Sequence, residues 1–404
     1  MIAAIETDLA AVCQRDTTLE TLLQQPEGKR ILSCIQCGIC AGTCPYGEYM
    51  DFPPRRIISM LRHGLMEEVF RSDSMLRCVA CYACMTKCPR GIRLSDVLLP
   101  LVKEQTLQRA PEMPAELQRS LQNTLRYGNP MGESSRKRAQ WVSTCPVPVP
   151  LMAEIRRPVD VLWFVECYTS YYPRGQDNSR AVARLFNALG IDFAILGNEE
   201  KCAGDCGQLT WEAGLFETLT DYNMEIFKKY KFNRLVTGDT HAYNAFRIRY
   251  PMYGFNYELD HTTPFLARQV DRLKPKLKRP LNLTVTYHDA CCLGRRAGFY
   301  EEGRTLLRAI PGVRLVEMVH NRSNSLCCGG GGGGMWLDTY FKQKGMDRLS
   351  ERRVKEALAT GADVLAISCP YEVYRFEDAL KTLPHARPML VRDVVELLAE
   401  SLED

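Results

Sequence analysis

The chain of 404 residues is 46% hydrophobic and 25% charged, which is the composition of a globular protein with packed cores. Its length suggests two or three domains, and its formal net charge of +4 is too small to indicate binding to nucleic acid. No apolar run approaches the ~18 residues that a transmembrane helix requires, and the first residues lack the pattern of a secretion signal.

Two cysteine runs near the N-terminus have the ligand spacing of bacterial-type [4Fe–4S] sites. The first is Cys34-x2-Cys37-x2-Cys40-x3-Cys44-Pro45, and the second repeats it as Cys78-x2-Cys81-x2-Cys84-x3-Cys88-Pro89. In two-cluster ferredoxins the fourth cysteine of each run binds the other cluster. The spacing therefore predicts one cubane held by Cys34, Cys37, Cys40 and Cys88, and a second held by Cys78, Cys81, Cys84 and Cys44. Zinc sites and disulfides do not require this repeated spacing.

The segments around these runs predict helices rather than strands. Between the runs, apolar residues from Ile57 to Phe70 recur near helical spacing, and Ser72 or Asp73 predicts the cap of a short second helix. Residues 92–107 predict a further helix. We therefore expect residues 1–107 to form an all-helical two-cluster ferredoxin domain. Residues 108–158, which are rich in proline and arginine, predict a linker.

The rest of the chain is an internal repeat, with a first lobe at 159–275 and a second at 276–404. Each half opens on a buried-strand pattern, VDVLWFVEC and LTVTYHDAC, and continues with a helix around ARLFNALG or RTLLRAIPG. A second strand, a cysteine–glycine segment, a further helix and a third strand follow in both. Strands that alternate with helices predict parallel sheets. The expected fold class is α+β and multidomain, with a helical domain followed by two α/β lobes.

The second lobe places several cysteines at predicted strand ends, where ligands gather in parallel sheets. They are Cys291, Cys292, Cys327, Cys328 and Cys369. Adjacent cysteines are hard to explain as core packing, so the pattern predicts a metal–sulfur site. The run Gly329–Gly334 is either a flexible linker or a backbone that approaches cluster sulfurs closely.

The first lobe retains fewer candidate ligands, namely Cys167, Cys202, Cys206 and His241, with Asp239 nearby. Three cysteines with a histidine or aspartate form a zinc or cluster site in some proteins. Alternatively, this lobe has lost its metal and only supports its twin. The residues alone leave both interpretations open.

A family resemblance rests on these motifs. The segment CIQCGICAGTCP…DSMLRCVACYACMTKCPRGI resembles the C-type subunit of heterodisulfide reductase, and residues 159–390, with HDACCLGR, NSLCCGGGGG and ISCPYE, resemble its B-type subunit. Fused in this order, roughly residues 30–390 resemble the D-type subunit of the membrane-bound heterodisulfide reductase. The resemblance implies iron–sulfur redox chemistry of the kind found in anaerobic metabolism.

In that family a complete lobe holds a noncubane [4Fe–4S] cluster that cleaves disulfides. Carried over, its motif gives Cys291, Cys327, Cys328 and Cys369, with Glu372 in place of the last cysteine and Cys292 as an extra one. One possibility is that Cys292 replaces the missing last cysteine as a ligand, and another is that four thiolates hold an ordinary cubane. In the second case Glu372 is an oxygen ligand, a proton donor near the substrate or a solvated acid. We regard Cys292 and Glu372 as the candidate catalytic residues.

In the first lobe, Ala203, Asp239 and Ala242 stand where the family has cysteines. The resemblance therefore implies that this lobe holds no noncubane cluster. Zinc remains the alternative cofactor there.

Together these features predict an iron–sulfur electron-transfer subunit of a larger redox complex. A flavoprotein or a membrane cytochrome b-type protein exchanges electrons with the two cubanes, and the third cluster passes them to a thiol–disulfide substrate or a further partner. Whether the chain is itself an enzyme stays open. The alternative is an iron–sulfur subunit of a flavin dehydrogenase, of the glycolate or glycerol-3-phosphate type, which passes electrons toward quinone. A structural docking module is a third possibility.

The sequence has no flavin- or nucleotide-binding fingerprint, so any flavin belongs to a partner. Thiolate ligands require a reducing compartment. We therefore expect a cytoplasmic protein that reaches the inner face of the membrane only through a partner.

Overall fold

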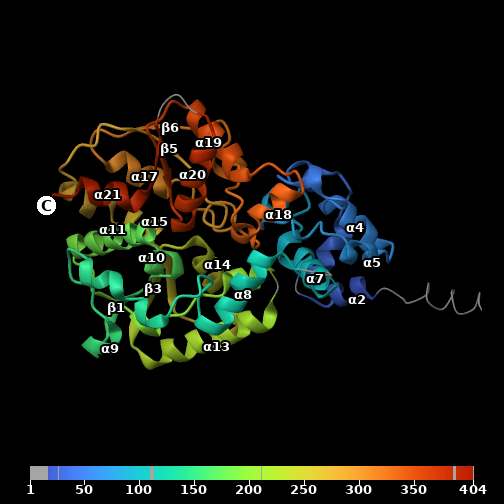
Figure 1. Ribbon diagram of the computed structural model, residues 1–404, viewed down its shortest axis with the longest axis horizontal. Helices are drawn as coiled ribbons and strands as arrows, with labels where there is room; N and C mark the ends of the chain where they lie inside the picture. The colour runs from blue at the N-terminus through green and yellow to red at the C-terminus, as the bar shows by residue number, and fades with distance from the viewer. Residues whose placement is uncertain (1–16, 26, 110–112, 211, 385–387, 404) are drawn as a thin grey trace, which may run out of the picture. The chain divides into compact units, whose positions relative to one another are not determined.

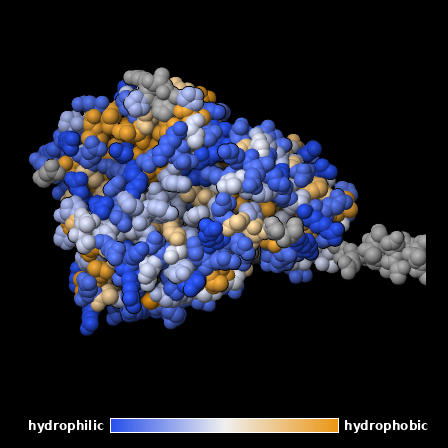
Figure 2. Space-filling view, in the orientation of Figure 1, coloured by the Kyte–Doolittle hydropathy of each residue, from blue (hydrophilic) through white to orange (hydrophobic). Residues whose placement is uncertain are grey.

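The computed structural model describes residues 17–25, 27–109, 113–210, 212–384 and 388–403. The chain divides into two compact units, residues 1–113 and 114–404, whose elements are labelled in Figure 1. None of the helices in these described ranges is long and apolar enough to cross a membrane. On the face shown in Figure 2 the surface is mostly hydrophilic, with one broad apolar area over the second lobe.

The residues that the structure describes in the first unit form helices joined by turns and loops, with no strand among them. Its elements are α2 (Thr18–Leu23), η1 (Gly28–Ser33), α3 (Ile39–Gly42), η2 (Gly47–Tyr49), α4 (Pro54–Arg62), α5 (Met66–Arg71), α6 (Ala83–Thr86) and α7 (Leu94–Arg109). The predicted short helix capped by Ser72 or Asp73 is wrong: α5 ends at Arg71, and bends and turns follow it. The helical segment is interrupted earlier, at Gly64, whose positive φ of 67° suits glycine and ends a helix.

The two cysteine runs repeat the same backbone path. Gln36 (φ 56°) and Gly38 (φ 85°) in the first run correspond to Ala80 (φ 47°) and Tyr82 (φ 61°) in the second. A positive φ is costly for residues with a side chain, and a costly conformation that recurs at two equivalent positions indicates a shared constraint. Here the constraint is a chain that winds around its own sulfur atoms.

The second unit contains two parallel four-stranded sheets with equivalent strand orders, β2-β1-β3-β4 and β6-β5-β7-β8. The first lobe supplies β1 (Val159–Phe164), β2 (Phe193–Ile195), β3 (Phe232–Thr237) and β4 (Glu258–His261). The second lobe supplies β5 (Thr284–Tyr287), β6 (Arg314–Val316), β7 (Val364–Ile367) and β8 (Leu390–Asp393). The predicted helical unit and the two predicted α/β lobes are thus confirmed, and each sheet has a fourth strand that the sequence patterns did not indicate.

Helices cover both sheets (Figure 1). In the first lobe these are α10 (Cys167–Tyr171), α11 (Pro173–Leu189), α12 (Asp205–Thr210), α13 (Ala213–Lys229), α14 (Thr240–Ile248), η6 (Tyr250–Tyr253), α15 (Thr262–Ala267) and α16 (Val270–Leu273). The helices of the second lobe are α17 (Glu302–Ala309), α19 (Leu349–Ala359), α20 (Pro370–Thr382) and α21 (Val394–Ser401), with η9 (Gly334–Trp336) and α18 (Asp338–Gln343) away from the sheet.

One hydrophobic core continues from lobe to lobe. Alternate residues of β1 point to opposite faces, so Val161 and Trp163 pack in this shared core whereas Leu162 and Phe164 pack in a core private to the first lobe. The shared core includes Val285 and further residues from the second lobe. Arg174 on α11 adds an ion pair with Glu377 (3.0 Å) and another with Glu396. The two lobes therefore form one packed body.

Residues 108–158, expected to be a linker, include folded structure. Helix α8 (Ala115–Tyr127), the single turns η3 (Ser135–Lys137) and η4 (Gln140–Thr144), and α9 (Met152–Ile155) lie in this segment. Trp141 is 2% exposed and belongs to the shared core, and the Arg138 side chain is also buried. Proline and arginine suggested an exposed segment, but the partners that bury Trp141 and Arg138 lie far along the chain and leave no local pattern.

Candidate functional site

The two N-terminal cysteine runs exchange their fourth members in space. One pocket is lined by Cys34, Cys37 and Cys40 together with Cys88 from the other run. A second pocket is lined by Cys78, Cys81 and Cys84 together with Cys44. Cys84 also lies at the edge of the first pocket, so the two sites adjoin. The eight cysteines are thus arranged as the crossed assignment expects, although the ligand assignment itself stays a prediction.

Among the cysteines of these pockets Cys84 is buried, Cys37 is exposed and the others are partly exposed. Burial raises the pKa of Cys40 to about 11, with neighbouring thiols adding to the effect, and it raises the pKa of Cys84 well above its usual value. Donors nevertheless face individual sulfurs: the Gln36 backbone N–H lies 3.4 Å from Cys34 Sγ, and Ser95 Oγ lies 3.3 Å from Cys84 Sγ. Buried thiols become thiolates when metal cations bind them, so these pockets fit iron–sulfur clusters.

The five cysteines of the second lobe are all buried and follow three strands of one sheet. Cys291 and Cys292 come after β5, Cys327 and Cys328 after β6, and Cys369 after β7 at the start of α20. Because the strands are parallel, all five lie at the carboxyl edge of the sheet. Burial raises the pKa of Cys369 well above its usual value, and the nearby Glu372 carboxylate raises it further. This donor set also fits a metal–sulfur cluster.

A histidine that the sequence patterns did not single out completes this site. His288 Nε2 lies 3.1 Å from Glu372 Oε1, and the ligand atoms of His288, Cys328 and Glu372 all lie within 4.8 Å of one another. Arg353 Nε donates a hydrogen bond to His288 Nδ1 (2.9 Å), so the ring proton is held on Nε2, toward Glu372. The one local signal for His288 is its position directly after β5.

Glu372 itself is 3% exposed, so it is not a solvated acid. Its buried carboxylate beside cysteine and histidine suits an oxygen ligand or a group that holds a proton. Those two of its three predicted roles remain.

The glycine run is a buried part of the site and not a flexible linker. Residues 329–334 are all buried, and the Gly329 N–H donates to Cys327 Sγ at 3.3 Å. A Cβ at Gly330 would lie 3.1 Å from Met335 Sδ, and one at Gly333 would lie 2.9 Å from Thr210 Cγ2. Side chains at these positions would crowd these neighbours, so glycine allows the close packing. The run thus brings the Gly329 N–H group close to sulfur.

The first lobe has a buried cation where its twin has cysteines. The Arg138 guanidinium lies 3.5 Å from Cys167 Sγ and 2.6 Å from Glu200 Oε1, and both Arg138 and Glu200 are buried. Burial works against this cation, but Cys167 and Glu200 raise the pKa of Arg138 well above its usual value. An arginine so held supplies the positive charge that a metal would supply to Cys167.

The four predicted ligands of the first lobe do not form one donor group. Cys167 and Cys202 lie together with Glu166, with their ligand atoms within 4.8 Å of one another, whereas Cys206 and His241 lie outside that group. Glu166, at φ 76°, accepts hydrogen bonds from the Cys167 and Ala203 backbone N–H groups, both at 2.8 Å. Its carboxylate is therefore already used to hold the backbone.

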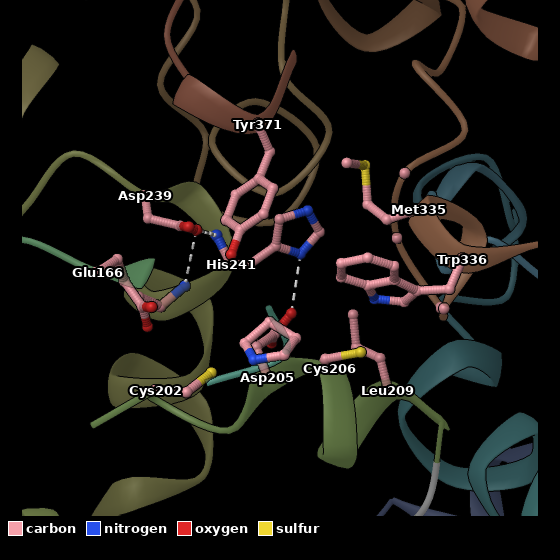
Figure 3. Close-up of a pocket in the computed structure, with 16 residues that line it drawn as sticks. Glu166, Cys202, Asp205, Cys206, Leu209, Asp239, His241, Met335, Trp336 and Tyr371 are labelled. Carbon is pink, nitrogen blue, oxygen red and sulfur yellow. Dashed lines mark hydrogen bonds and ion pairs between the residues drawn. The ribbon is translucent and has the colours of Figure 1, made fainter. Parts of the chain in front are cut away.

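Cys206 and His241 instead line a cavity of about 60 Å³ between the two lobes (Figure 3). His241 Nδ1 lies 2.8 Å from Asp205 Oδ2. The second lobe closes the cavity with residues 330–333 of the glycine run, Met335, Trp336 and Tyr371. This cavity and the five-cysteine site are adjacent, because the glycine run borders both.

Comparisons with known families agree with this division of the chain. The 4Fe-4S dicluster domain family matches residues 30–92, and the cysteine-rich domain family matches residues 161–247 and again 285–371. The second match ends at Tyr371, just after Cys369, and both matches cover the strand ends described above.

Several curated proteins are similar to the chain over most of its length. It is 34% identical to the probable iron-sulfur-binding oxidoreductase FadF of Bacillus subtilis over 84% of this chain and 48% of that protein. It is 30% identical to the EtfAB:quinone oxidoreductase of Syntrophomonas wolfei, over 86% of this chain and 49% of that protein. The chain thus spans about half the length of these two relatives. It is also 30% identical to the D-type subunit of the dihydromethanophenazine:CoB--CoM heterodisulfide reductase of Methanosarcina barkeri, over 92% and 93%.

Proposed function

Since the chain belongs to the family of heterodisulfide reductase D-type subunits, which are iron–sulfur electron-transfer proteins, we propose that it carries electrons between a redox partner and a third cluster site in its second lobe. The two cubanes of the dicluster domain form the outer part of this route. Bound [4Fe–4S] clusters supply reversible one-electron transfer, and the residues of the chain position and tune them.

The single observation that carries the proposal is the set of five buried cysteines in the second lobe. Cys291, Cys327, Cys328 and Cys369 are the family ligands, and Cys292 lies beside them. Such a group of thiols without a cation would be costly to ionise, as the raised pKa of Cys369 shows. In our proposal a metal–sulfur cluster offsets that cost here, whereas Arg138 offsets it in the first lobe.

The surrounding residues have separate tasks in this proposal. The Gly329 N–H group donates to Cys327 Sγ, which favours the more negative, reduced state of a cluster. Arg353 fixes the His288 proton on Nε2 and so orients it toward Glu372. Glu372 and His288 then form a buried pair that can hold a proton beside the cysteines, which is the role we assign to them together with Cys292.

The partners in this scheme are redox proteins, a flavoprotein or a membrane cytochrome b-type protein, that bring the otherwise cytoplasmic chain to the inner face of the membrane. The Cys37 side of the first pocket is where such a partner gains access. Cys37 is exposed, and Ile35 beside it is 62% exposed, whereas Cys84 of the second pocket is buried. Electron transfer falls steeply with distance, so the more exposed site is the natural point of exchange.

The test is the iron and sulfide content of the anaerobically purified chain. Three clusters require about twelve iron atoms per chain, and two require about eight. About twelve iron, with an EPR signal from a third centre, supports the proposal. About eight iron, all bound by the first unit, contradicts it and leaves the second unit as a docking platform. Cys145→Ala is a suitable control, because this half-exposed cysteine belongs to none of the sites.

A second candidate function is the iron–sulfur subunit of a flavin dehydrogenase that passes electrons toward quinone. The name of the Syntrophomonas wolfei relative, EtfAB:quinone oxidoreductase, favours it over disulfide cleavage, as does Glu372 at the position of the last family cysteine. Co-purification with a flavin-containing protein supports this candidate. Cleavage of a disulfide by the cluster-loaded chain with an artificial electron donor supports the heterodisulfide-type chemistry instead.

A further inference from the structure

We propose that the cavity between the two lobes binds the ring of a neutral two-electron acceptor of the quinone class, and not an anionic disulfide. The proposal rests on the third cluster site proposed above, because the acceptor needs an electron source at its side. A bound quinone would take up two electrons, which a reduced flavoprotein partner supplies, and two protons from water, and leave as the hydroquinone.

The cavity lies between the two lobes and beside the five-cysteine site. Its walls come from both lobes, with Asp205, Asp239 and His241 on one side and the glycine run on the other. A Cβ placed on Gly330, which lines the cavity, would lie 3.7 Å from Cys328 Sγ. A ligand ring that contacts Gly330 would therefore lie close to Cys328 of the five-cysteine site.

The charge of the cavity favours a neutral ligand. Among the residues that the structure describes, its lining includes Glu166, Asp205 and Asp239 but neither lysine nor arginine. The one basic group, His241, is already paired with Asp205. An anion that entered would lose its hydration and find no net positive charge in return, which disfavours its binding. Disulfides that carry sulfonate, phosphate or carboxylate groups are therefore poor ligands here.

The remaining wall of the cavity favours a planar ring. Leu209, Met335, Trp336 and Tyr371 give it an apolar and largely aromatic surface, on which a planar ring packs well. Figure 3 shows the His241 ring between Tyr371 and Trp336, with its Nδ1 turned to Asp205 and its other nitrogen toward the open space. The Tyr371 hydroxyl and the His241 ring both line the cavity, and both can hydrogen-bond to a ring carbonyl.

The size of the cavity limits its ligand. A cavity of about 60 Å³ holds on the order of four to six water molecules. That space suits a single substituted ring whose substituents extend toward the opening. It does not suit a bulky nucleotide-bearing cofactor, and the lining offers no cation for a phosphate.

The test measures binding to the oxidised, cluster-loaded chain by equilibrium dialysis with three probes. They are 2,3,5,6-tetramethyl-1,4-benzoquinone (neutral, with one ring and no position open to thiol addition), 2-hydroxyethyl disulfide (neutral) and 2-sulfonatoethyl disulfide (dianionic). We expect saturable binding of one quinone per chain and no measurable binding of the dianion. Tighter binding of either disulfide than of the quinone would overturn the proposal.

Paired variants on one helix locate the binding site. Tyr371 lines the cavity, whereas Tyr374, three residues further along α20, is 53% exposed. We expect Tyr371→Phe to weaken quinone binding about fivefold or more, as the loss of one buried hydrogen bond implies, and Trp336→Ala to weaken it more strongly. Tyr374→Phe should have no effect. Equal effects of Tyr371→Phe and Tyr374→Phe, or full binding by Trp336→Ala, would place the quinone elsewhere and sink the idea.

Iron content separates the failure of this inference from the failure of the proposed function. A chain with about twelve iron atoms that binds no quinone refutes only the inference. A chain with about eight iron atoms refutes the proposed third cluster, whatever the dialysis shows.

Discussion

The two lobes have equivalent sheets but different side chains at the strand ends. The position after β3 in the first lobe and after β7 in the second illustrates the difference. After β3, Asp239 caps α14, where its carboxylate accepts hydrogen bonds from the His241 (2.7 Å) and Ala242 (3.1 Å) backbone N–H groups. After β7, Cys369 precedes α20 and makes no side-chain cap. Aspartate is among the best capping residues. The first lobe therefore uses this position for stability, whereas the second gives up a cap to hold a thiol.

The same contrast holds around the other cysteines. In the first lobe the cation beside Cys167 is Arg138, which belongs to the chain itself and is buried with Glu200. In the second lobe five buried cysteines follow the strands of the sheet. In our proposal the duplicated fold thus balances the charge of its thiolates in two ways, by the Arg138 side chain in the first lobe and by a metal–sulfur cluster in the second.

The largest expected effect is on metal content. Cys369→Ala should remove about four iron atoms per chain, because one cubane-sized cluster loses a ligand. Cys202→Ala in the first lobe should remove neither iron nor zinc. Metal and sulfide analysis of both variants checks this pair. Loss of metal from Cys202→Ala would show that the first lobe is a metal site and would break the comparison.

The next effect is on stability and concerns the buried ion pair of the first lobe. Arg138→Leu leaves Glu200 buried without its partner and should lower the free energy of unfolding of the second unit by about 3–5 kcal/mol. Adding Glu200→Gln should recover part of the loss. Arg157→Leu breaks only an exposed pair with Asp192 and should cost at most about 1 kcal/mol. Urea denaturation followed by circular dichroism measures all three, and similar losses for Arg138→Leu and Arg157→Leu would refute this account.

A smaller effect depends on pH. Burial lowers the pKa of His261 to about 4, so the folded chain binds fewer protons at this site than the unfolded chain, whose histidines titrate near 6.5. The stabilisation is complete above pH 6.5 and is lost as the pH falls toward 4, by about 2 kcal/mol between pH 7 and pH 5. His261→Gln should remove that part of the pH dependence.

At the equivalent position of the second lobe, the last residue of β8, burial instead raises the pKa of Asp393 well above its usual value. The sign there is opposite, since stability from a carboxyl with a raised pKa falls as the pH increases. Asp393→Asn should therefore remove a loss of stability that begins as the pH rises above about 4, where the unfolded carboxyl ionises. The same pH dependence for His261→Gln and the unaltered chain would contradict the assignment.

The helix cap at Asp239 should contribute about 1 kcal/mol to the free energy of unfolding of the second unit. Asp239→Ala removes both capping hydrogen bonds and should destabilise the second unit by that amount, whereas Asp239→Asn keeps an accepting oxygen and should cost less. Thermal unfolding of the two variants, compared at the same pH, measures the difference. An Asn variant as unstable as the Ala variant would show that the charge, and not the cap, matters.

The smallest expected effect is on the rate at which a partner protein reduces the cubane pocket of Cys37. Arg55 and Arg90 line the pocket of the exposed Cys37, and no carboxylate lines it with them. Arg55→Glu should slow reduction of the chain by an acidic flavodoxin a few-fold at low salt, because rim charges act mainly on association rates. Arg119→Glu, an exposed change on α8, is the matched control. If reduction by dithionite, a small molecule, slows equally, the effect is not one of docking.

Much of the fold was predictable because the signals are local. The cysteine spacing of Cys34–Cys88 and the strand-like runs around Cys167 and Cys291 depend on neighbours in sequence. The fourth strands, β4 and β8, were missed because ELDH and LVRD are short and half polar, and only pairing with β3 and β7 makes them strands.

The missed parts of the site depend on long-range contacts. Arg138 lies in a segment without periodicity, and its partner Glu200 is 62 positions away. His288 gains its role from Arg353 and Glu372. No local pattern distinguishes such residues from ordinary core and surface residues. The five cysteines were found because adjacent thiols at strand ends rarely serve packing alone.

The hydrophobic core that continues from lobe to lobe has a consequence for changes in the first lobe. Val161, Trp163 and Phe186 of the first lobe pack in the same cluster as Val285 and Leu397 of the second. Deleting the first lobe would expose that apolar face to water, at a cost far above what a single domain can bear. Mutations that remove metal ligands from the first lobe would therefore leave that lobe indispensable, because its apolar side chains complete the core of the second lobe.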